Sequence, residues 1–221
     1  MRDAARLAVM FVLTVDQHDS RRTTDRVPEL IAALHDVPLR LRPERTAGDE
    51  VQMLADSADA VLACVLRMLE LGGWSVGIGI GPVELPLPAS VREGRGDAFI
   101  AARRAVESAR RTSSIPVSVR TADPRQREQT EELQALLRLV GREVTSRKPG
   151  QWRVVHAMRE DPSATQAQIA ERLEVTQQTV SRAFTTSGWR EEQAVHPLVR
   201  RLLAMLDLTS DRSMDRPGHL P

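Results

Sequence analysis

The sequence predicts an α+β protein in which a sheet-containing N-terminal domain precedes an all-α C-terminal domain. Up to residue 122, β-rich apolar runs alternate with amphipathic stretches, whereas the chain after residue 150 has only short helical patterns. The N-terminal pattern reads strand, helix, strand, strand, helix, strand, helix, strand. We therefore expect domains at 1–122 and 150–208, a connecting helix and linker at 123–149, and a disordered tail at 209–221.

The first half of the N-terminal domain contains a buried strand, a helix and a hairpin. Leu7–Val15 is almost wholly apolar, which is typical of a strand covered on both faces. Asp25–Leu34 places apolar residues at helical spacing. Leu39–Thr46 alternates apolar and basic residues, and Ala47–Glu50 is a tight turn into a second strand at Val51–Leu54.

The second half begins with a strong helix at Asp56–Leu71, for which Asp56 or Ser57 can serve as the N-cap. Gly77 and Gly79 interrupt the next strand, so we expect another part of the chain to approach its backbone closely. The remainder of this half is predicted to be a strand at Trp74–Ile80, a helix at Ala98–Arg111 and a last strand at Ile115–Val119.

The C-terminal half is predicted to be helical. Gln126–Val140 is a charged amphipathic helix, and Ser146–Gly150 has the composition of a linker. Pro197 is predicted to begin a further helix. Its apolar stripe is either domain core or a dimer seam, and consists of Leu198, Leu202, Met205 and Leu206.

Composition excludes several classes of protein. The formal net charge is +1, so a nucleic-acid partner has to be recognised by a local surface. Cys64 is the only cysteine, and its apolar neighbours indicate a buried side chain without catalytic or metal-binding chemistry. The apolar run at 7–15 lacks a small-residue cleavage site, and no run reaches the length of a membrane span, so we expect a cytoplasmic protein.

The most informative motif lies between Thr165 and Phe184. Ile169, Leu173, Val175 and Val180 are apolar where a three-helix core needs them, and Ala170 is small where two helices cross. A preceding helix at Gln151–Glu160 is expected to be the third helix of this core, to which it contributes Trp152, Val155 and Met158. Ser163 with Gln166 has the pattern of a capping box, and Thr176 can cap the last helix.

This segment resembles the helix-turn-helix of bacterial regulators. It departs at Glu174, where the turn usually has glycine and a left-handed backbone costs roughly 1 kcal/mol. No alternating strands follow Gly188, so we expect no β-wing. The resemblance implies binding of double-stranded DNA, with a protein-contact role as the alternative. The predicted contact residues are Thr176, Gln177, Gln178, Thr179, Ser181 and Arg182.

Three blocks of the N-terminal domain occur together in a known order. They are Asp16–Arg21, Thr46–Glu50 and Val76–Gly81, and Gly96–Arg103 follows them. Their order and spacing resemble the SatD family over roughly residues 7 to 120. The same strand order, with an aspartate ending the first strand and a Gly-Asp hairpin, is similar to the ferredoxin-like palm of class III nucleotidyl cyclases and GGDEF domains.

The palm resemblance implies a nucleotide or second-messenger site with Mg²⁺. Asp16 and Asp49 would be its metal ligands. The nucleotide-binding positions that it implies are Asp16, Asp19, Arg21, Asp49, Glu50 and Arg103. A palm kept only as a scaffold for dimerisation is the alternative.

The chain lacks two residues that class III cyclases use. It contains no asparagine, and its single lysine, Lys148, lies outside the domain. The hairpin also differs from the motif that diguanylate formation needs. We therefore expect a dimeric, non-enzymatic DNA-binding transcription regulator with a catalytically silent cyclase-like domain. The alternative is an active nucleotidyl cyclase with accessory DNA binding.

Overall fold

Five strands form one sheet in the order β2-β3-β1-β4-β5 in the computed structural model, which describes residues 6–20, 22–112 and 114–214. The strands are β1 (Arg6–Gln17), β2 (Leu41–Ala47), β3 (Glu50–Ala55), β4 (Trp74–Leu85) and β5 (Val117–Thr121). β1 lies antiparallel to β3 and β4, β2 lies antiparallel to β3, and β5 lies parallel to β4. The first four strands therefore form a split β-α-β-β-α-β unit, and β5 extends its edge.

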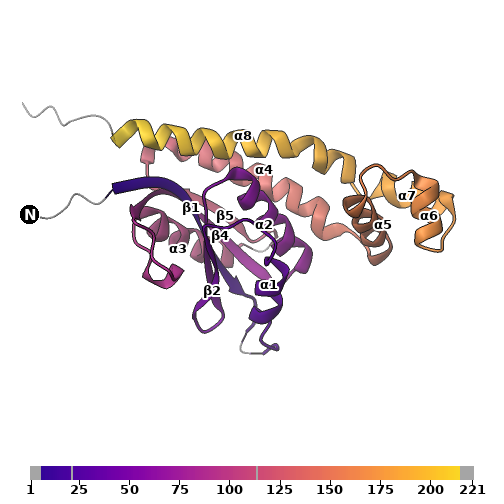
Figure 1. Ribbon diagram of the computed structural model, residues 1–221, viewed down its shortest axis with the longest axis horizontal. Coiled ribbons are helices and arrows are strands. Elements are labelled where there is room, and N and C mark those ends of the chain that lie inside the picture. Colours follow the sequence, from indigo (N-terminus) through magenta and orange to yellow (C-terminus); the bar gives the residue numbers. More distant parts are fainter. Residues whose placement is uncertain (1–5, 21, 113, 215–221) are drawn as a thin grey trace, which may run out of the picture.

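Eight α-helices and two short 3-10 helices, Val91–Glu93 and Pro124–Gln126, accompany the sheet in the described residues (Figure 1). The first four are α1 (Val27–Ala33), α2 (Ala58–Leu71), α3 (Asp97–Arg110) and α4 (Arg127–Ser146). The others are α5 (Pro149–Glu160), α6 (Gln166–Arg172), α7 (Gln177–Thr186) and α8 (Trp189–Met214). The predicted mixed α+β class and the predicted order of strands and helices are confirmed. No strand follows Thr121 in the described part of the chain.

Alternate residues of β1 enter two different hydrophobic cores, as the two-residue period of a strand requires. Phe11, Leu13 and Val15 are buried on the face that α1, α2, α4 and α8 cover. Met10 and Val12 are buried on the opposite face, against α3. Both faces of the central strand are therefore covered, which explains its unbroken apolar sequence.

The glycines of β4 allow α3 to lie directly on the sheet. A Cβ atom at Gly79 would lie 2.2 Å from the backbone nitrogen of Ala102, and one at Gly77 would lie 2.2 Å from that of Val106. The close approach that these glycines predict is confirmed. The partner is the backbone of α3, whose alanines keep the helix surface flat.

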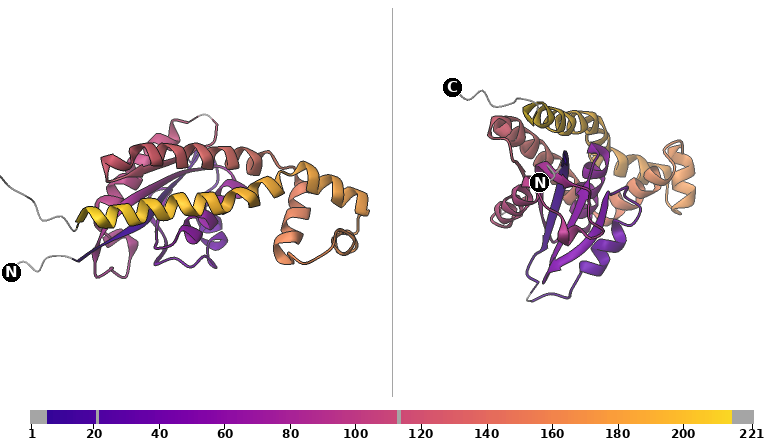
Figure 2. Two further views of the ribbon diagram at one scale, coloured as in Figure 1. Left: turned by 90° about the horizontal axis from the view of Figure 1, so that it is seen from above. Right: turned by 60° about the vertical axis from the view of Figure 1, so that its left-hand side comes forward.

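The last helix, α8, packs on the N-terminal sheet. It returns from the helix-turn-helix and runs beside α4 along the length of the molecule (Figure 2). Its residues Val199, Leu203 and Leu206 are fully buried in the same core as β1 and α2. The helix that we grouped with the C-terminal domain at 150–208 therefore completes the N-terminal core. The segment from α5 to α7 is an insertion between α4 and α8.

Three details of α8 correct the sequence reading. The helix begins at Trp189 and contains Pro197 in its interior. Its buried face is rotated from the predicted stripe, because Leu198 and Met205 are exposed. It continues to Met214, so the first part of the expected disordered tail is helical, and residues 215–221 lie outside the described residues.

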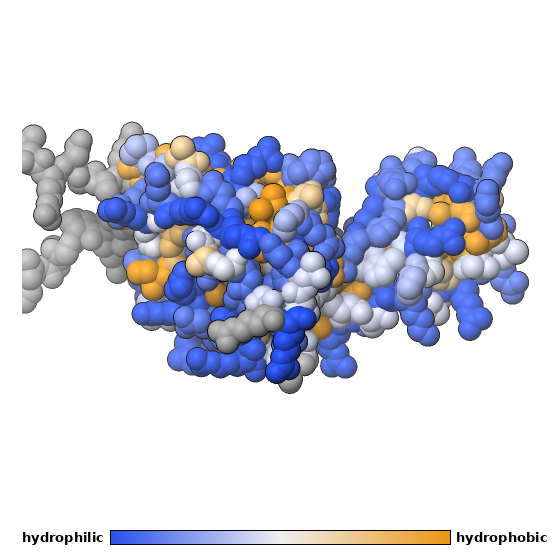
Figure 3. All heavy atoms as spheres, turned by 90° about the horizontal axis from the view of Figure 1, so that it is seen from below, coloured by the Kyte–Doolittle hydropathy of each residue, from blue (hydrophilic) through white to orange (hydrophobic). Residues whose placement is uncertain are grey.

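The helix-turn-helix stands out from one end of the body. From below, the molecule shows a large lobe and a small lobe joined by a narrower neck, with a largely hydrophilic surface (Figure 3). Within the described residues, no helix combines the length and apolarity needed to cross a membrane.

Candidate nucleic-acid interface

A small three-helix core holds the candidate DNA-reading surface. Val154 and Ala157 of α5 pack against Ile169 and Ala170 of α6 and against Val180 of α7. Leu173, Val175 and Met158 are half-buried around this core. The predicted apolar positions of α6 and α7 are thus confirmed. The helix predicted at Gln151–Glu160 is confirmed as α5, but only Met158 of its predicted core residues joins this core. Trp152 packs against the main core, and Val155 is fully buried outside the small cluster.

The helix caps fix where α6 and α7 begin. The Thr165 hydroxyl accepts from the Gln168 backbone N–H at 3.3 Å, and the Gln168 side chain accepts from the Thr165 N–H at 2.8 Å. The capping box therefore lies two residues after the predicted Ser163 pair, because Ser163 bonds Asp161 instead. Thr176 caps α7 as predicted, with its hydroxyl accepting from the Thr179 N–H at 3.1 Å.

The turn between α6 and α7 has the left-handed residue that the motif requires. Glu174 has φ 55°, the conformation that glycine usually occupies. The Arg153 side chain donates to the Leu173 carbonyl at 2.9 Å, and Val175 N–H donates to the Ala170 carbonyl at 3.0 Å. These bonds hold the turn closed despite the strain at Glu174.

The first turns of α7 present polar side chains to solvent. Gln177, Gln178, Thr179 and Arg182 are exposed, whereas Ser181 is half-buried. Thr176 is exposed, but its hydroxyl also contacts that of Thr179 at 2.9 Å, so capping occupies it. Because Val180 is fully buried between these residues, the exposed face has one fixed orientation on the core.

Further polar residues lie beside this face, and sequence reasoning did not select them. Gln166 and Gln168 lie in the first turn of α6, and Thr185 is exposed one turn after Ser181. The first helix of such a motif crosses the DNA backbone. Recognition of Thr165 as the N-cap of α6 would therefore have identified Gln166 and Gln168 as candidate contacts to the DNA backbone.

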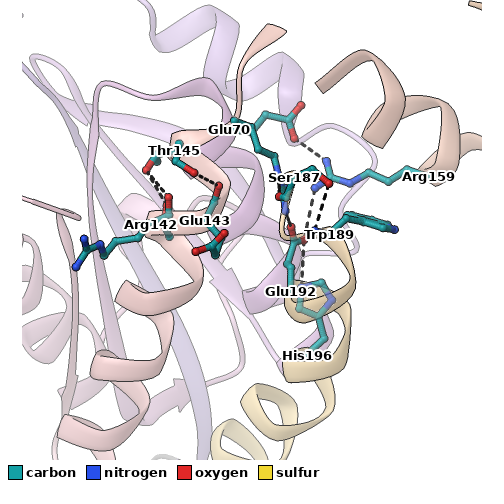
Figure 4. Close-up of polar contacts among 12 residues, drawn as sticks. Glu70, Arg142, Glu143, Thr145, Arg159, Ser187, Trp189, Glu192 and His196 are labelled. Carbon is teal, nitrogen blue, oxygen red and sulfur yellow. Dashed lines mark hydrogen bonds and ion pairs between the residues drawn. The ribbon is translucent and has the colours of Figure 1, made fainter. Parts of the chain in front are cut away.

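A buried charge cluster joins the helix-turn-helix to the body (Figure 4). Arg147, with a side chain 1% exposed, contacts fully buried Glu192 at 2.5 Å and donates to the Ser187 carbonyl at 2.8 Å. Arg159 of α5 contacts Glu192 at 3.7 Å and Glu70 of α2 at 2.6 Å. The connection predicted at 146–150 is shorter than expected, because α4 ends at Ser146 and α5 begins at Pro149, and Arg147 within it is buried.

Two tryptophans enclose the arginines of this cluster. The guanidinium carbon of Arg159 lies 5.3 Å from the ring centre of Trp152 and 5.2 Å from that of Trp189. The Arg147 guanidinium also lies over Trp152, at 5.0 Å. Cation–π contacts of this kind strengthen when they are desolvated. The orientation of the three-helix unit relative to the sheet is therefore fixed by packed side chains.

A separate polar groove of about 740 Å³ lies at the end of β1. Asp16, Asp19 and Asp49 line it, together with His18 and Arg110. The Asp16 carboxylate contacts Arg110 at 3.3 Å. Burial raises the pKa of Asp16 above its ordinary value, and the neighbouring charge of Asp49 raises it further. The two predicted metal-ligand positions are thus brought into one groove.

The remaining predicted nucleotide-binding residues lie at different places. Glu50 is opposite Asp16 in the sheet and contacts Arg103 at 3.1 Å, and neither Glu50 nor Arg103 lines the groove. Arg21 lies outside the described residues. Arg110, which the sequence reading missed, supplies a cation from the last turn of α3. Over the described ranges, no group of three or more His, Cys, Asp or Glu side chains is placed to hold a metal ion.

Comparison with known proteins identifies the C-terminal segment. Residues 145–185, from the end of α4 to near the end of α7, match the model of the MarR family. The helix-turn-helix is MarR-like. The match covers the core, the turn and the exposed first turns of α7, and it supports a DNA-binding transcription regulator.

Two other comparisons add no functional argument. No curated protein shows significant sequence similarity to the chain. One solved structure, a regulator of polyketide synthase expression from Bifidobacterium adolescentis, is 16% identical. The alignment covers 96% of this chain and 84% of that chain, with a TM-score of 0.28. At that TM-score the likeness carries no inference about fold or function.

Proposed function

We propose that this protein is a sequence-specific transcription regulator that binds double-stranded DNA as a homodimer. The observation that carries the proposal is the row of exposed polar side chains on α7, held in one orientation by the MarR-like core. In a helix-turn-helix, the N-terminal residues of the second helix contact base edges in the major groove. Gln178 can bond adenine in a bidentate manner, and Arg182 can contact guanine or phosphate.

Selection of bound sequences from random DNA tests this proposal directly. On the selected site, Gln178→Ala and Arg182→Ala are each expected to weaken binding by the loss of a base or phosphate contact. The loss of a good bidentate contact is about 1–3 kcal/mol, or roughly a 5- to 150-fold change in Kd. Fluorescence anisotropy at fixed salt measures this change.

Matched controls separate contact loss from general damage. Gln193→Ala on α8 and Arg104→Ala on α3 remove the same side-chain types from exposed positions outside the three-helix unit. Both are expected to leave the Kd unchanged. Unchanged binding by Gln178→Ala and Arg182→Ala together would reject this reading surface. Failure to enrich any sequence would favour a protein-contact role for the motif.

We further infer that the groove at the end of β1 binds a nucleotide with Mg²⁺ without turning it over. Mg²⁺ is commonly held by one or two carboxylates together with phosphate oxygens, and Asp16 with Asp49 fits that donor set. The raised pKa of Asp16 shows that its ionised form is disfavoured by its surroundings. A cation in the groove would offset both the burial of the Asp16 carboxylate and the charge of Asp49, and Arg110, which lines the same groove, would contact phosphate.

Thermal unfolding with each nucleoside triphosphate and Mg²⁺ tests the groove. A binding nucleotide is expected to raise the Tm of the wild type, because a ligand that binds only the folded state stabilises it. Asp49→Ala is expected to abolish the rise, and Asp97→Ala, at the start of α3, is expected to retain it. Pyrophosphate is measured in the same samples. Steady release that Asp49→Ala abolishes would instead establish the cyclase alternative.

A further inference from the structure

The outer face of α4 carries an exposed apolar residue. Leu139 is 63% exposed, which is the largest exposed fraction of any large apolar residue in the described part of the chain. It lies on the opposite side of α4 from Leu133, Leu137 and Val144, which are buried in the main core. No described element covers this face, although the helix is held firmly on its inner side.

Charged residues flank Leu139 in a self-complementary order. At helical spacing, the exposed row of α4 reads Glu132, Ala135, Leu139 and Arg142. Glu132 and Arg142 form no ion pair within the described residues, whereas their neighbour Glu131 pairs with Arg127. Figure 4 shows the Arg142 side chain extending away from the charge cluster at the joint.

The neighbouring helix also carries exposed apolar residues. On α8, Leu198 is 37% exposed and Met205 is 50% exposed. Arg200 of α8 pairs with Asp59 of α2, and Leu198, two residues earlier, projects from nearly the opposite side of the helix. Because α8 lies between α2 and α4, this side is the one turned toward α4 (Figure 2). Exposed apolar side chains are therefore present on both of the adjacent helices α4 and α8.

We propose that the outer face of α4 binds a second copy of the chain, with the two α4 helices antiparallel about a twofold axis at the level of residue 137. Residues equidistant from 137 then face each other. Glu132 lies opposite the partner's Arg142, and Ala135 lies opposite the partner's Leu139. Each charged pair occurs twice, because a twofold interface is isologous. The small Ala135 provides room for the leucine, as close helix packing requires.

This interface rests on the homodimer of the proposed function. It specifies the surface through which the two copies associate. Arg147, where each α4 meets its helix-turn-helix, lies ten residues beyond the axis, or about 15 Å at 1.5 Å per residue. The two motifs would therefore start about 30 Å apart along α4. This separation is comparable to the 34–36 Å between half-sites one helical turn apart.

Charge reversal tests the interface, with oligomeric mass measured by sedimentation equilibrium. Glu132→Arg and Arg142→Glu each place like charges opposite one another and are expected to weaken self-association by about tenfold or more. The double variant exchanges the charges and is expected to restore the wild-type dimer. Leu139→Asp is expected to be monomeric. Arg104→Glu, an exposed reversal on α3, is expected to remain dimeric.

Several results would overturn the proposal. These are a monomeric wild type at micromolar concentration, single reversals that leave the dimer intact, and a double variant that remains dissociated. Circular dichroism confirms that each variant is folded. DNA binding is measured separately: a dimer that binds DNA and is insensitive to the charge reversals would reject only this interface. A charge-dependent dimer that enriches no DNA sequence would reject only the DNA-binding function.

Discussion

Gly79→Ala is expected to unfold the N-terminal domain or to lower its stability severely. The added Cβ would lie 2.2 Å from both the Ala102 nitrogen and the Ala98 carbonyl oxygen, which are backbone atoms of α3. A side chain can rotate away from a clash, but a helix backbone cannot. Overpacking costs typically 1–3 kcal/mol where side chains adjust, so we expect at least about 3 kcal/mol here.

Denaturant unfolding of purified protein measures this effect, and soluble yield gives a second readout. Gly150→Ala is the matched control, because nothing lies within 4 Å of a Cβ there and Gly150 is in the first turn of α5. That control is expected to be neutral or slightly stabilising. A Gly79→Ala protein with wild-type stability would mean that α3 does not lie directly on β4.

Glu192→Leu is expected to destabilise the fold by about 3–5 kcal/mol, the usual cost of leaving one member of a buried ion pair without its partner. Arg147 would remain buried with its main counter-charge removed. The double variant Arg147→Met/Glu192→Leu is expected to regain most of the loss, because apolar side chains of similar size can replace a buried pair. Urea unfolding of the wild type, Glu192→Leu, Arg147→Met and the double variant completes a double-mutant cycle.

The exposed pair Arg127–Glu131 is the control for this cycle. Its side chains are 82% and 57% exposed, so Glu131→Ala is expected to cost less than about 1 kcal/mol. A loss of similar size for Glu131→Ala and Glu192→Leu would contradict the structural role of the joint. So would a double variant that is no more stable than Glu192→Leu.

The same glutamate makes the joint sensitive to acid. Burial alone would raise the pKa of Glu192, but His196 and the charges of Arg147 and Arg159 lower it below its ordinary value. A carboxyl group with a lowered pKa in the folded state stabilises the fold above its unfolded pKa. That contribution is lost as the pH falls through the lowered value. In the double variant, the free energy of unfolding is therefore expected to fall less steeply than in the wild type as the pH is lowered. Urea unfolding at a series of acidic pH values measures this difference.

The sequence predicted the N-terminal strands and helices well, because each has a local signal. Ser57 caps α2, Gly72 and Gly73 follow its end, and β1 is a long apolar run. The glycines of β4 predicted a close contact but not the segment that makes it, because Ala98 and Ala102 reach that strand only in the folded chain. Core spacing likewise located α6 and α7, and the Thr176 cap located the start of α7.

The helix α8 shows why the remainder was not predictable. Its apolar residues cover more than half of its circumference, so Leu198 and Val199 are equally plausible core positions in the sequence. Only the groove between α2 and α4 selects Val199. Arg147 was misread for a related reason. An arginine beside proline and glycine has the composition of a linker, and its burial depends on Glu192, which is 45 residues further along the chain.

The position of α8 also determines when this protein can finish folding during synthesis. Domains usually fold as units while the chain emerges from the ribosome, at about 5–20 residues per second. Here the chain must extend roughly 70 residues beyond the end of α4 before the last helix of the sheet domain has been made. For about 3–14 s the surface of β1, α2 and α4 that α8 later covers is open to water. The nascent chain is therefore most prone to aggregation just before its C-terminal helix is complete.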